Sequence, residues 1–448
     1  MNIEDFLSRS VEKLRSYPKS TRIRIISHYD TDGICSAAIL VKSIEREGFD
    51  FHVSLLSHPF AEELKKLKEE ENDLIIFSDL GSGQIDLIKD LGVDSIILDH
   101  HQPECKDVVI GSIIQINSNL FGIDGNFEIS GAGMCYLFAR ALSKENVDLS
   151  IFSLLGATGD KQNLGGFKGV NKEIFEEARK SDLIKMSRAS LKMGNGDLID
   201  EITNSVDPFY PQLSGRREKV EEFLSKLSIS KDSKYWDLNG EEKKRLHSFL
   251  MVGLLKNGIE PEVADEIIRE RIISDKLPLN FDIISEMIDS CSKSGDPGLA
   301  LSFCLNPEKY FEIVRSKSEE YKKKILEGLV RLEDGDLKER KNMVYFLAEK
   351  ASEGSYMSGI VSNYFDCKAK PVFSFAEKNG EIHVSCRARR RVVEQGLDLG
   401  QLMRKIAKRF GGAGGGHKIA AGGTFEGASL EELIEYIDSA LGENESQV

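Results

Sequence analysis

Short apolar runs alternate with helical patterns through the first third of the chain, and this alternation restricts the possible fold most. The strand candidates span roughly residues 23–26, 51–56, 73–79, 95–98 and 108–116. The segments between them, such as 34–44 and 61–70, carry apolar residues at helical spacing. Strands separated by helices of this length pair in parallel. The sequence therefore predicts an α/β domain with a parallel sheet and helices on both faces.

Histidine and aspartate residues directly follow three of these runs. They are His28-Tyr29-Asp30-Thr31-Asp32-Gly33 after the first, Asp79 at the end of the third, and Asp99-His100-His101 after the fourth. In open α/β sheets the functional site lies beyond the carboxyl ends of the strands, so we expect these side chains to converge there. Asp160 adds a fourth contribution, because it follows an apolar helix and the small-residue segment Gly156-Ala157-Thr158-Gly159.

The first of these stretches is expected to stay extended. Side chains at i, i+2 and i+4 of an extended chain share one side, so His28, Asp30 and Asp32 would converge. Tyr29 and Thr31 would then point the other way. A solvated acidic turn is the alternative for this stretch taken alone. With three further Asp and His segments in the chain, a cation site is the better interpretation.

The types of ligand restrict the choice of metal. Three or four carboxylates with two imidazoles and no thiolate suit Mn²⁺ or Mg²⁺ rather than structural zinc. One ion with open positions needs fewer ligands than this. Two ions about 3.5–4 Å apart that share a bridging carboxylate fit better, and such pairs catalyse in-line displacement at phosphorus. We therefore predict a metal-dependent phosphoesterase.

The four segments resemble the four-motif signature of the DHH phosphoesterase superfamily in order and spacing. By that resemblance the metal ligands are His28, Asp30, Asp32, Asp79, His100 and Asp160. The resemblance also implies that Asp79 bridges the two ions and that His101 faces the scissile phosphate. Asp99 would orient a histidine, and ligation by Asp99 itself stays open. No ligand of the family's set is missing, which disfavours an inactive relative.

The middle of the chain is predicted to be helical. Helical patterns span 246–255, 264–273, 283–288 and 311–332. Ser214, in the Pro- and Gly-punctuated segment 207–215, is expected to cap the helix that follows it. The apolar stripes of these helices are interpreted as core and not as a cofactor site.

Basic residues gather near the C-terminus of an acidic chain. The net charge is −14, yet between Val384 and Lys418 the only acidic residues are Glu394 and Asp398. The basic residues are Arg387, Arg389, Arg390, Arg391, Arg404, Lys405, Lys408 and Arg409. Because nucleic-acid binding requires only a local basic surface, the net charge does not exclude a polyanion partner. A solvated helix face is the alternative for the cluster at 404–409.

The segment 411–418, Gly-Gly-Ala-Gly-Gly-Gly-His-Lys, is predicted to be a phosphate-binding loop. Its glycines free backbone N–H groups to surround an anion, and His417 and Lys418 add donors. A flexible linker is the alternative, but a strand pattern at 422–425 follows. The segment resembles the DHHA1 domain that accompanies DHH phosphoesterases. By this resemblance the residues that contact nucleic acid are Ser385, Arg387, Gly414, Gly415, Gly416 and His417.

Three parts are predicted: a DHH domain over 1–190, a helical connecting region over 191–335 and an α+β DHHA1 domain over 336–448. The last contains strands at 343–347, 371–375 and 382–386, the latter two joined by the hairpin turn Asn379-Gly380. Seven scattered cysteines without CxxC spacing argue against a disulfide framework or a zinc ribbon. No run of about 18 apolar residues and no signal pattern occurs, so a cytoplasmic protein without a membrane partner is expected.

The resemblance implies a RecJ-like exonuclease that acts on single-stranded DNA or RNA with two Mn²⁺ or Mg²⁺ ions, in DNA replication and repair. It is nearest to archaeal RecJ-like proteins, including the nuclease associated with the GINS replication complex, so GINS is an expected partner. RecJ-like enzymes imply 5′–3′ digestion of single-stranded DNA, although the residues alone fix neither polarity nor the choice of DNA over RNA. The alternatives are a phosphodiesterase for oligoribonucleotides or cyclic dinucleotides, and a replisome scaffold related to the RecJ-like helicase cofactor of eukaryotes.

Overall fold

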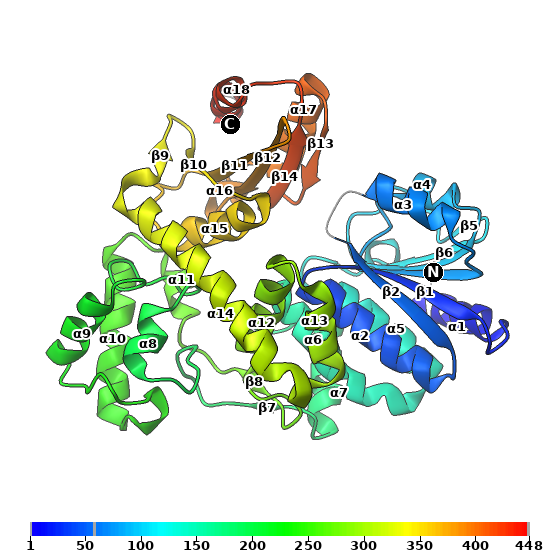
Figure 1. Ribbon diagram of the computed structural model, residues 1–448, viewed down its shortest axis with the longest axis horizontal. Coiled ribbons are helices and arrows are strands. Elements are labelled where there is room, and N and C mark those ends of the chain that lie inside the picture. Colours follow the sequence, from blue (N-terminus) through cyan, green and yellow to red (C-terminus); the bar gives the residue numbers. More distant parts are fainter. Residues whose placement is uncertain (1, 57–59, 446–448) are drawn as a thin grey trace. The chain divides into compact units, whose positions relative to one another are not determined.

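The computed structural model describes residues 2–56 and 60–445 (Figure 1). The chain forms two compact units. The first contains Met1–Ser190 and Glu270–Tyr321, and the second contains Leu191–Arg269 and Lys322–Val448. The range 191–335 thus contributes to both units, and the three-part division of the chain remains a prediction. No helix of the described ranges is long and apolar enough to cross a membrane.

A six-stranded sheet with the order β2-β1-β3-β4-β6-β5 organises the first unit. Its parallel strands are β1 (Arg22–His28), β2 (Asp50–Leu56), β3 (Leu74–Ser78), β4 (Asp94–Asp99) and β6 (Ile113–Asn117). The single strand expected over 108–116 is wrong: β5 (Val109–Ile110) pairs antiparallel with β6. The chain reverses at Gly111, whose φ of +60° favours glycine. The predicted α/β class with a parallel-dominated sheet is confirmed.

Alternate residues of these strands face two separate cores. Ile76 and Leu98 belong to the buried cluster that also holds α2 (Thr31–Arg46) and α5 (Gly131–Leu142). Phe77 and Ile97 point to the opposite face and pack with α3 (Phe60–Glu69) and α4 (Ile85–Lys89). Figure 1 shows these two helix pairs on opposite sides of the sheet. Because both faces are buried, the strands hold the residues that follow their carboxyl ends in fixed positions.

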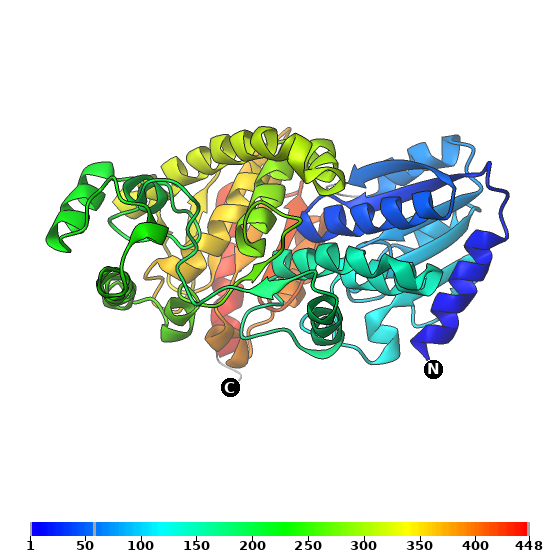
Figure 2. The ribbon, with the colours of Figure 1, turned by 90° about the horizontal axis from the view of Figure 1, so that it is seen from below.

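The larger core extends over several more helices. In the first part of the chain they are α1 (Ile3–Arg15), α6 (Ser150–Gly159) and α7 (Gly169–Lys180). Both α5 and α6 pack against α2. Figure 2 shows α2, in blue, running along the sheet. The helices α12 (Phe281–Lys293) and α13 (Pro297–Leu305) come from residues after 269 and add Ile284, Ile288 and Phe303 to the same core.

Two predictions for the middle of the chain are wrong. The helix expected over 264–273 is α11 (Pro261–Asp265) followed by β8 (Ile272–Ile273), which pairs with β7 (Lys185–Met186). Ser214 does not cap α9 (Arg217–Lys226), because its hydroxyl accepts a hydrogen bond from the Tyr210 N–H at 2.9 Å. The remaining helices of this region are α8 (Leu198–Thr203), α10 (Gly240–Lys256) and α14 (Pro307–Arg331).

The second unit contains a six-stranded sheet with the order β13-β14-β12-β11-β10-β9. The strands are β9 (Lys338–Glu339), β10 (Val344–Leu347), β11 (Val372–Lys378), β12 (Glu381–Arg387), β13 (Ala413–Gly416) and β14 (Ala420–Phe425). The helices are α15 (Ala351–Tyr364), α16 (Arg390–Glu394), α17 (Leu399–Phe410) and α18 (Leu430–Glu445). One face of the sheet packs Phe373 and Val384 against Met403 of α17 and Ile437 of α18.

The predicted phosphate-binding loop is in large part an edge strand. Gly414 and Gly415 of β13 pair with Gly423 and Gly422 of β14. Close packing explains the glycines, because a Cβ atom at Gly414 would lie 2.6 Å from the Met403 carbonyl oxygen. The prediction of a loop over 411–418 is therefore wrong for 413–416.

Candidate metal centre

The first motif is divided between a strand end and a helix start. β1 ends at His28, and Asp30 is the N-cap residue of α2, where its carboxylate accepts a hydrogen bond from the Gly33 N–H at 3.0 Å. Asp32 lies in the first turn of the helix. The expectation that the chain stays extended through Asp32 is therefore wrong, and helical geometry directs this side chain. Thr31 donates to the Ser285 carbonyl at 2.9 Å.

Asp79 follows β3 in a left-handed backbone conformation, with φ of +57°. Aspartate tolerates this region better than most residues, and unusual backbone geometry of this kind is common at functional sites. The side chain is 1% exposed, and its Oδ1 lies 3.2 Å from Nε2 of His100. Its Oδ2 lies 3.7 Å from Nδ1 of His28. Among the described residues, neither oxygen accepts a hydrogen bond, so both are open to a cation.

The backbone orients the imidazole of His100. Its Nδ1 lies 2.6 Å from the Gly125 carbonyl oxygen, which can only accept, so Nδ1 carries a proton. Its Nε2 then faces Asp79, Asp160 at 3.5 Å and Asp32 at 3.7 Å. A nitrogen surrounded by three carboxylates takes either a proton or a metal ion. Metal-binding histidines typically donate a hydrogen bond from the ring nitrogen that does not bind the metal, as Nδ1 of His100 does to Gly125.

The N-terminus of α5 holds Asp32. The N–H groups of Gly131 and Ala132 donate to its two carboxylate oxygens at 2.6 and 3.0 Å. A Cβ atom at Gly131 would lie 2.6 Å from Oδ1 of Asp79, and one at Gly156 would lie 2.3 Å from Oδ1 of Asp32. Sequence reasoning missed Gly131 and Gly125. The Ser-Gly-Ala-Gly segment that begins α5 was the signal for the former.

The six predicted ligands and His101, which was predicted to face the phosphate, form three overlapping groups, in each of which the candidate ligand atoms lie within 4.8 Å of one another. The groups are His28, Asp30 and Asp79; Asp79, His100 and His101; and Asp32, His100 and Asp160. Asp79 and His100 each belong to two of them. The structure thus brings together all six predicted ligands from four separate segments, and the donor set suits Mn²⁺ or Mg²⁺.

The electrostatics of the cluster favour binding of a cation. Burial and the charge of Asp79 raise the pKa of Asp32 to about 7. Burial and the charge of Asp32 likewise raise the pKa of Asp160 well above its usual range. For His100, burial opposes the charged form, but the surrounding carboxylates outweigh it and raise the pKa. Carboxylates crowded in this way are stabilised by a bound divalent ion.

Asp99 and His101 form a separate pair beside the cluster. Oδ1 of Asp99 lies 2.9 Å from Nδ1 of His101 and accepts the N–H groups of His100 and His101, while Oδ2 accepts the Ser82 N–H. Burial opposes ionisation of Asp99, but His101 outweighs it and lowers the pKa. Asp99 is 1% exposed and His101 is 43% exposed. Within the described ranges, Asp99 belongs to none of the three ligand groups.

The predicted substrate contacts lie in the second unit. Ser385 pairs with Gly422 of β14, which pairs with Gly415 of β13, so Ser385 and Gly415 stand in one row across the sheet. Arg387 donates to the Ser355 hydroxyl at 3.2 Å. His417 is exposed, and its backbone N–H donates to the Ala420 carbonyl at 2.8 Å.

Arg389 does not contribute to the predicted basic surface. It is 8% exposed, and its guanidinium donates to the carbonyls of Ser362 and Phe365 at 2.6 and 2.7 Å. It also lies 3.6 Å from Glu260. Its role is therefore to join helix ends within the unit.

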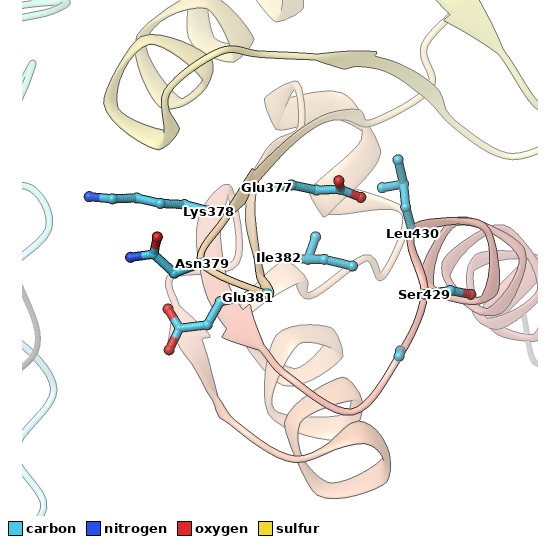
Figure 3. Close-up of a pocket in the computed structure, with 9 residues that line it drawn as sticks. Glu377, Lys378, Asn379, Glu381, Ile382, Ser429 and Leu430 are labelled. Carbon is cyan, nitrogen blue, oxygen red and sulfur yellow. The ribbon is translucent and has the colours of Figure 1, made fainter.

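A surface hollow in the second unit is lined by none of the predicted site residues. It lies between the β11–β12 turn and the start of α18, and its lining includes Glu377, Asn379, Ile382, Ser429 and Leu430 (Figure 3). Lys378 and Asn379 point away from Ile382 in this view. The hollow offers no imidazole and none of the predicted ligands.

Two family models match the chain: the DHH family, N-terminal domain, at residues 22–157, and the DHHA1 domain at 340–443. An uncharacterized protein of Methanocaldococcus jannaschii is 32% identical over 450 residues, which cover 97% of this chain and 99% of that protein. The single-stranded-DNA-specific exonuclease RecJ of Bacillus subtilis is 26% identical over 229 residues, which cover 47% of this chain and 28% of RecJ.

Solved structures share the fold. RecJ of Thermus thermophilus in complex with Mn²⁺ aligns with a TM-score of 0.60 and 17% identity, over 98% of this chain and 55% of that one. CDC45 of Entamoeba histolytica aligns with a TM-score of 0.66 and 13% identity, over 97% and 99%. The chain thus spans about half the length of Thermus RecJ. From its two matching domains, its archaeal relative and its likeness to RecJ, the chain belongs to the DHH superfamily as a RecJ-like member with a DHHA1 domain.

Proposed function

We propose that the chain is a metal-dependent phosphodiesterase that digests single-stranded nucleic acid from an end. The observation that carries this proposal is the convergence of six predicted ligands around Asp79, whose buried oxygens accept no hydrogen bond from a described residue. The name of Bacillus RecJ and the Mn²⁺ in Thermus RecJ support it. A 5′–3′ polarity on DNA, a role in replication and repair, a cytoplasmic location and GINS as a partner belong to the same proposal.

Two ions fit the ligand groups better than one. His28 and Asp30 would hold the first, Asp32, Asp160 and His100 the second, and Asp79 would lie between them. Such ions supply an activated water and neutralise charge on the phosphate. The chain's own residues fix this arrangement: Gly125 orients His100, and the N–H groups of Gly131 and Ala132 orient Asp32.

His101 would bind the phosphate. Burial and the neighbouring His100 lower its pKa, but Asp99 outweighs them and raises it, so the ring favours the charged form. Asp99 accepts a hydrogen bond from Nδ1–H of His101, and the charged ring also carries a proton on Nε2, which would donate to a phosphate oxygen. A donor held in place before the substrate arrives stabilises charge that develops in the transition state. Arg387, Ser385, His417 and the glycines of β13 would hold a neighbouring phosphate of the strand.

Two other functions remain candidates. The likeness to CDC45 over nearly the whole chain favours a replisome scaffold as the second. A phosphodiesterase for oligoribonucleotides or cyclic dinucleotides would use the same ligands on a shorter substrate. A scaffold function would give no role to the six predicted ligands. Metal-dependent turnover would therefore distinguish it from the exonuclease and from the phosphodiesterase for short substrates.

Digestion of end-labelled strands tests the proposal. Single-stranded DNA and RNA, labelled at either end, and a cyclic dinucleotide would be incubated with Mn²⁺, with Mg²⁺ and with a chelator. We expect metal-dependent shortening of a single strand, abolished by Asp79→Asn and retained by Asp86→Asn, a matched change at an exposed carboxylate of α4. Turnover of the cyclic dinucleotide alone would favour the short-substrate function, and no turnover in any metal would favour the scaffold.

A further inference from the structure

An aromatic side chain is exposed beside the metal centre. Phe127 is 57% exposed, more than any other large apolar residue of the described ranges. Leu164, on a second loop, is 42% exposed. Single exposed apolar residues are common on protein surfaces and need no function by themselves. The position of Phe127 is what distinguishes it.

The loop that carries Phe127 is fixed to a predicted metal ligand. The Gly125 carbonyl accepts from Nδ1 of His100 at 2.6 Å and from the Gln162 side chain at 3.0 Å. Gln162 also donates to the Ile129 carbonyl at 3.2 Å, so both sides of Phe127 are tied down. Residues two apart are separated by at most about 7 Å along the chain. The Cα atom of Phe127 therefore lies within about 7 Å of that of Gly125, whose carbonyl contacts the imidazole of His100.

A cation accompanies the ring. Nζ of Lys168 lies 5.7 Å from the centroid of Phe127. The two acidic residues of the loop are engaged within it: Asp124 accepts from the Asn126 N–H at 2.8 Å, and Glu128 accepts from the Asp124 N–H at 2.9 Å. The loop thus presents a flat apolar face and an ammonium group, which match a base and a phosphate of one nucleotide.

We propose that Phe127 stacks against the nucleobase of the nucleotide held at the metal centre, while Lys168 contacts a phosphate of the same strand. This inference rests on the proposed function and adds its substrate class: a strand whose terminal nucleotide carries a base. Every base has a flat face, so stacking selects for the presence of a base and not for its identity. An abasic end is a poor substrate for this site.

A double-mutant cycle, in which the Phe127 side chain and the base of the substrate are each removed, tests the stacking contact. Wild type, Phe127→Ala and Phe127→Trp would digest single strands whose nucleotide at the attacked end is either normal or abasic. We expect loss of the base to raise KM of the wild type about tenfold and to change that of Phe127→Ala less than twofold, with Phe127→Trp restoring the difference. Phe249→Ala is the matched control, because Phe249 is 56% exposed on α10 and has no assigned role.

The outcomes separate this inference from the function on which it rests. If the wild type digests normal strands but base removal affects wild type and Phe127→Ala equally, the stacking site is refuted and the nuclease function stands. If the wild type digests neither strand in Mn²⁺ or Mg²⁺, both fall. For Lys168→Ala we expect the log–log salt dependence of strand binding to become shallower by one unit or less. An unchanged slope would remove Lys168 from the site.

Discussion

Replacement of Asp79 by asparagine should remove activity and at the same time destabilise the metal-free protein. Asparagine accepts the left-handed backbone conformation of this position, so the fold has no reason to change. In the metal-free protein the carboxylate is ion-paired with two imidazoles, His100 at 3.2 Å and His28 at 3.7 Å, and both pairs are lost. What disappears is one buried negative charge.

The size of the effect follows from the geometry. Oδ1 of Asp79 lies 3.2 Å and Oδ2 of Asp32 lies 3.7 Å from the same nitrogen of His100. These oxygens are therefore at most about 7 Å apart, which corresponds to a repulsion of about 2 kcal/mol at an effective dielectric constant of about 20. On the same basis the charged His100 ring, 3.2 Å from Oδ1 of Asp79, attracts it by about 5 kcal/mol, which exceeds the repulsion. Relief of burying the charge offsets part of this loss, so we expect a destabilisation of about 1 kcal/mol or more, or at least about 2–4 °C in Tm.

Calorimetric melting with and without metal measures both halves of this prediction. In chelator, Asp79→Asn should melt below the wild type. Added Mn²⁺ should raise the Tm of the wild type but not that of the variant, because only the native site binds the ion. Strand digestion should fall by orders of magnitude. A variant that melts higher than wild type in chelator, or that keeps more than about a tenth of the rate with metal bound, would refute the reasoning.

Three further predictions use the same assays. His100→Ala should lose Mn²⁺ affinity in titration calorimetry, whereas His101→Ala should keep it and lose rate; equal metal loss would contradict the two roles. Gly131→Ala should weaken Mn²⁺ binding about tenfold or more, because its Cβ would meet Asp79 at 2.6 Å, whereas Gly83→Ala, with nothing within 4 Å, should not. Arg387→Ala with His417→Ala should raise KM for long strands more than it lowers kcat and should flatten the salt dependence of binding. Unchanged binding and slope would place the strand elsewhere.

The sequence was sufficient to predict which side chains meet at the sheet edge. His28, Asp79 and His100 directly follow buried strands, and parallel strands bring their carboxyl ends to one edge. The turn after β1 was mispredicted, because Asp30 caps a helix that begins at once and the strand period stops there. A capping aspartate and an extended one have the same local sequence pattern, and only the helix start distinguishes them.

Contacts between distant segments had no local signal. The N–H groups that hold Asp32 come from residues 131 and 132, and the carbonyl that accepts from Thr31 lies 254 positions away. The glycines of β13 were misassigned to a loop because the sequence does not reveal how closely α17 approaches the strand. Propensity against strand formation was overridden by this packing.

The contact of α12 with the first motif bears on when the metal centre is completed during synthesis of the chain. The Ser285 carbonyl accepts a hydrogen bond from the Thr31 hydroxyl, and the Ser292 hydroxyl donates to the Tyr29 carbonyl. The turn that carries Asp30 is thus held by a helix from beyond residue 269. All six ligands have left the ribosome long before α12 is made. We therefore expect a nascent chain to bind metal more weakly until α12 (Phe281–Lys293) has been made. A fragment that stops at Ser190 keeps all six predicted ligands but lacks the hydrogen bonds from α12 to Tyr29 and Thr31, the residues on either side of Asp30.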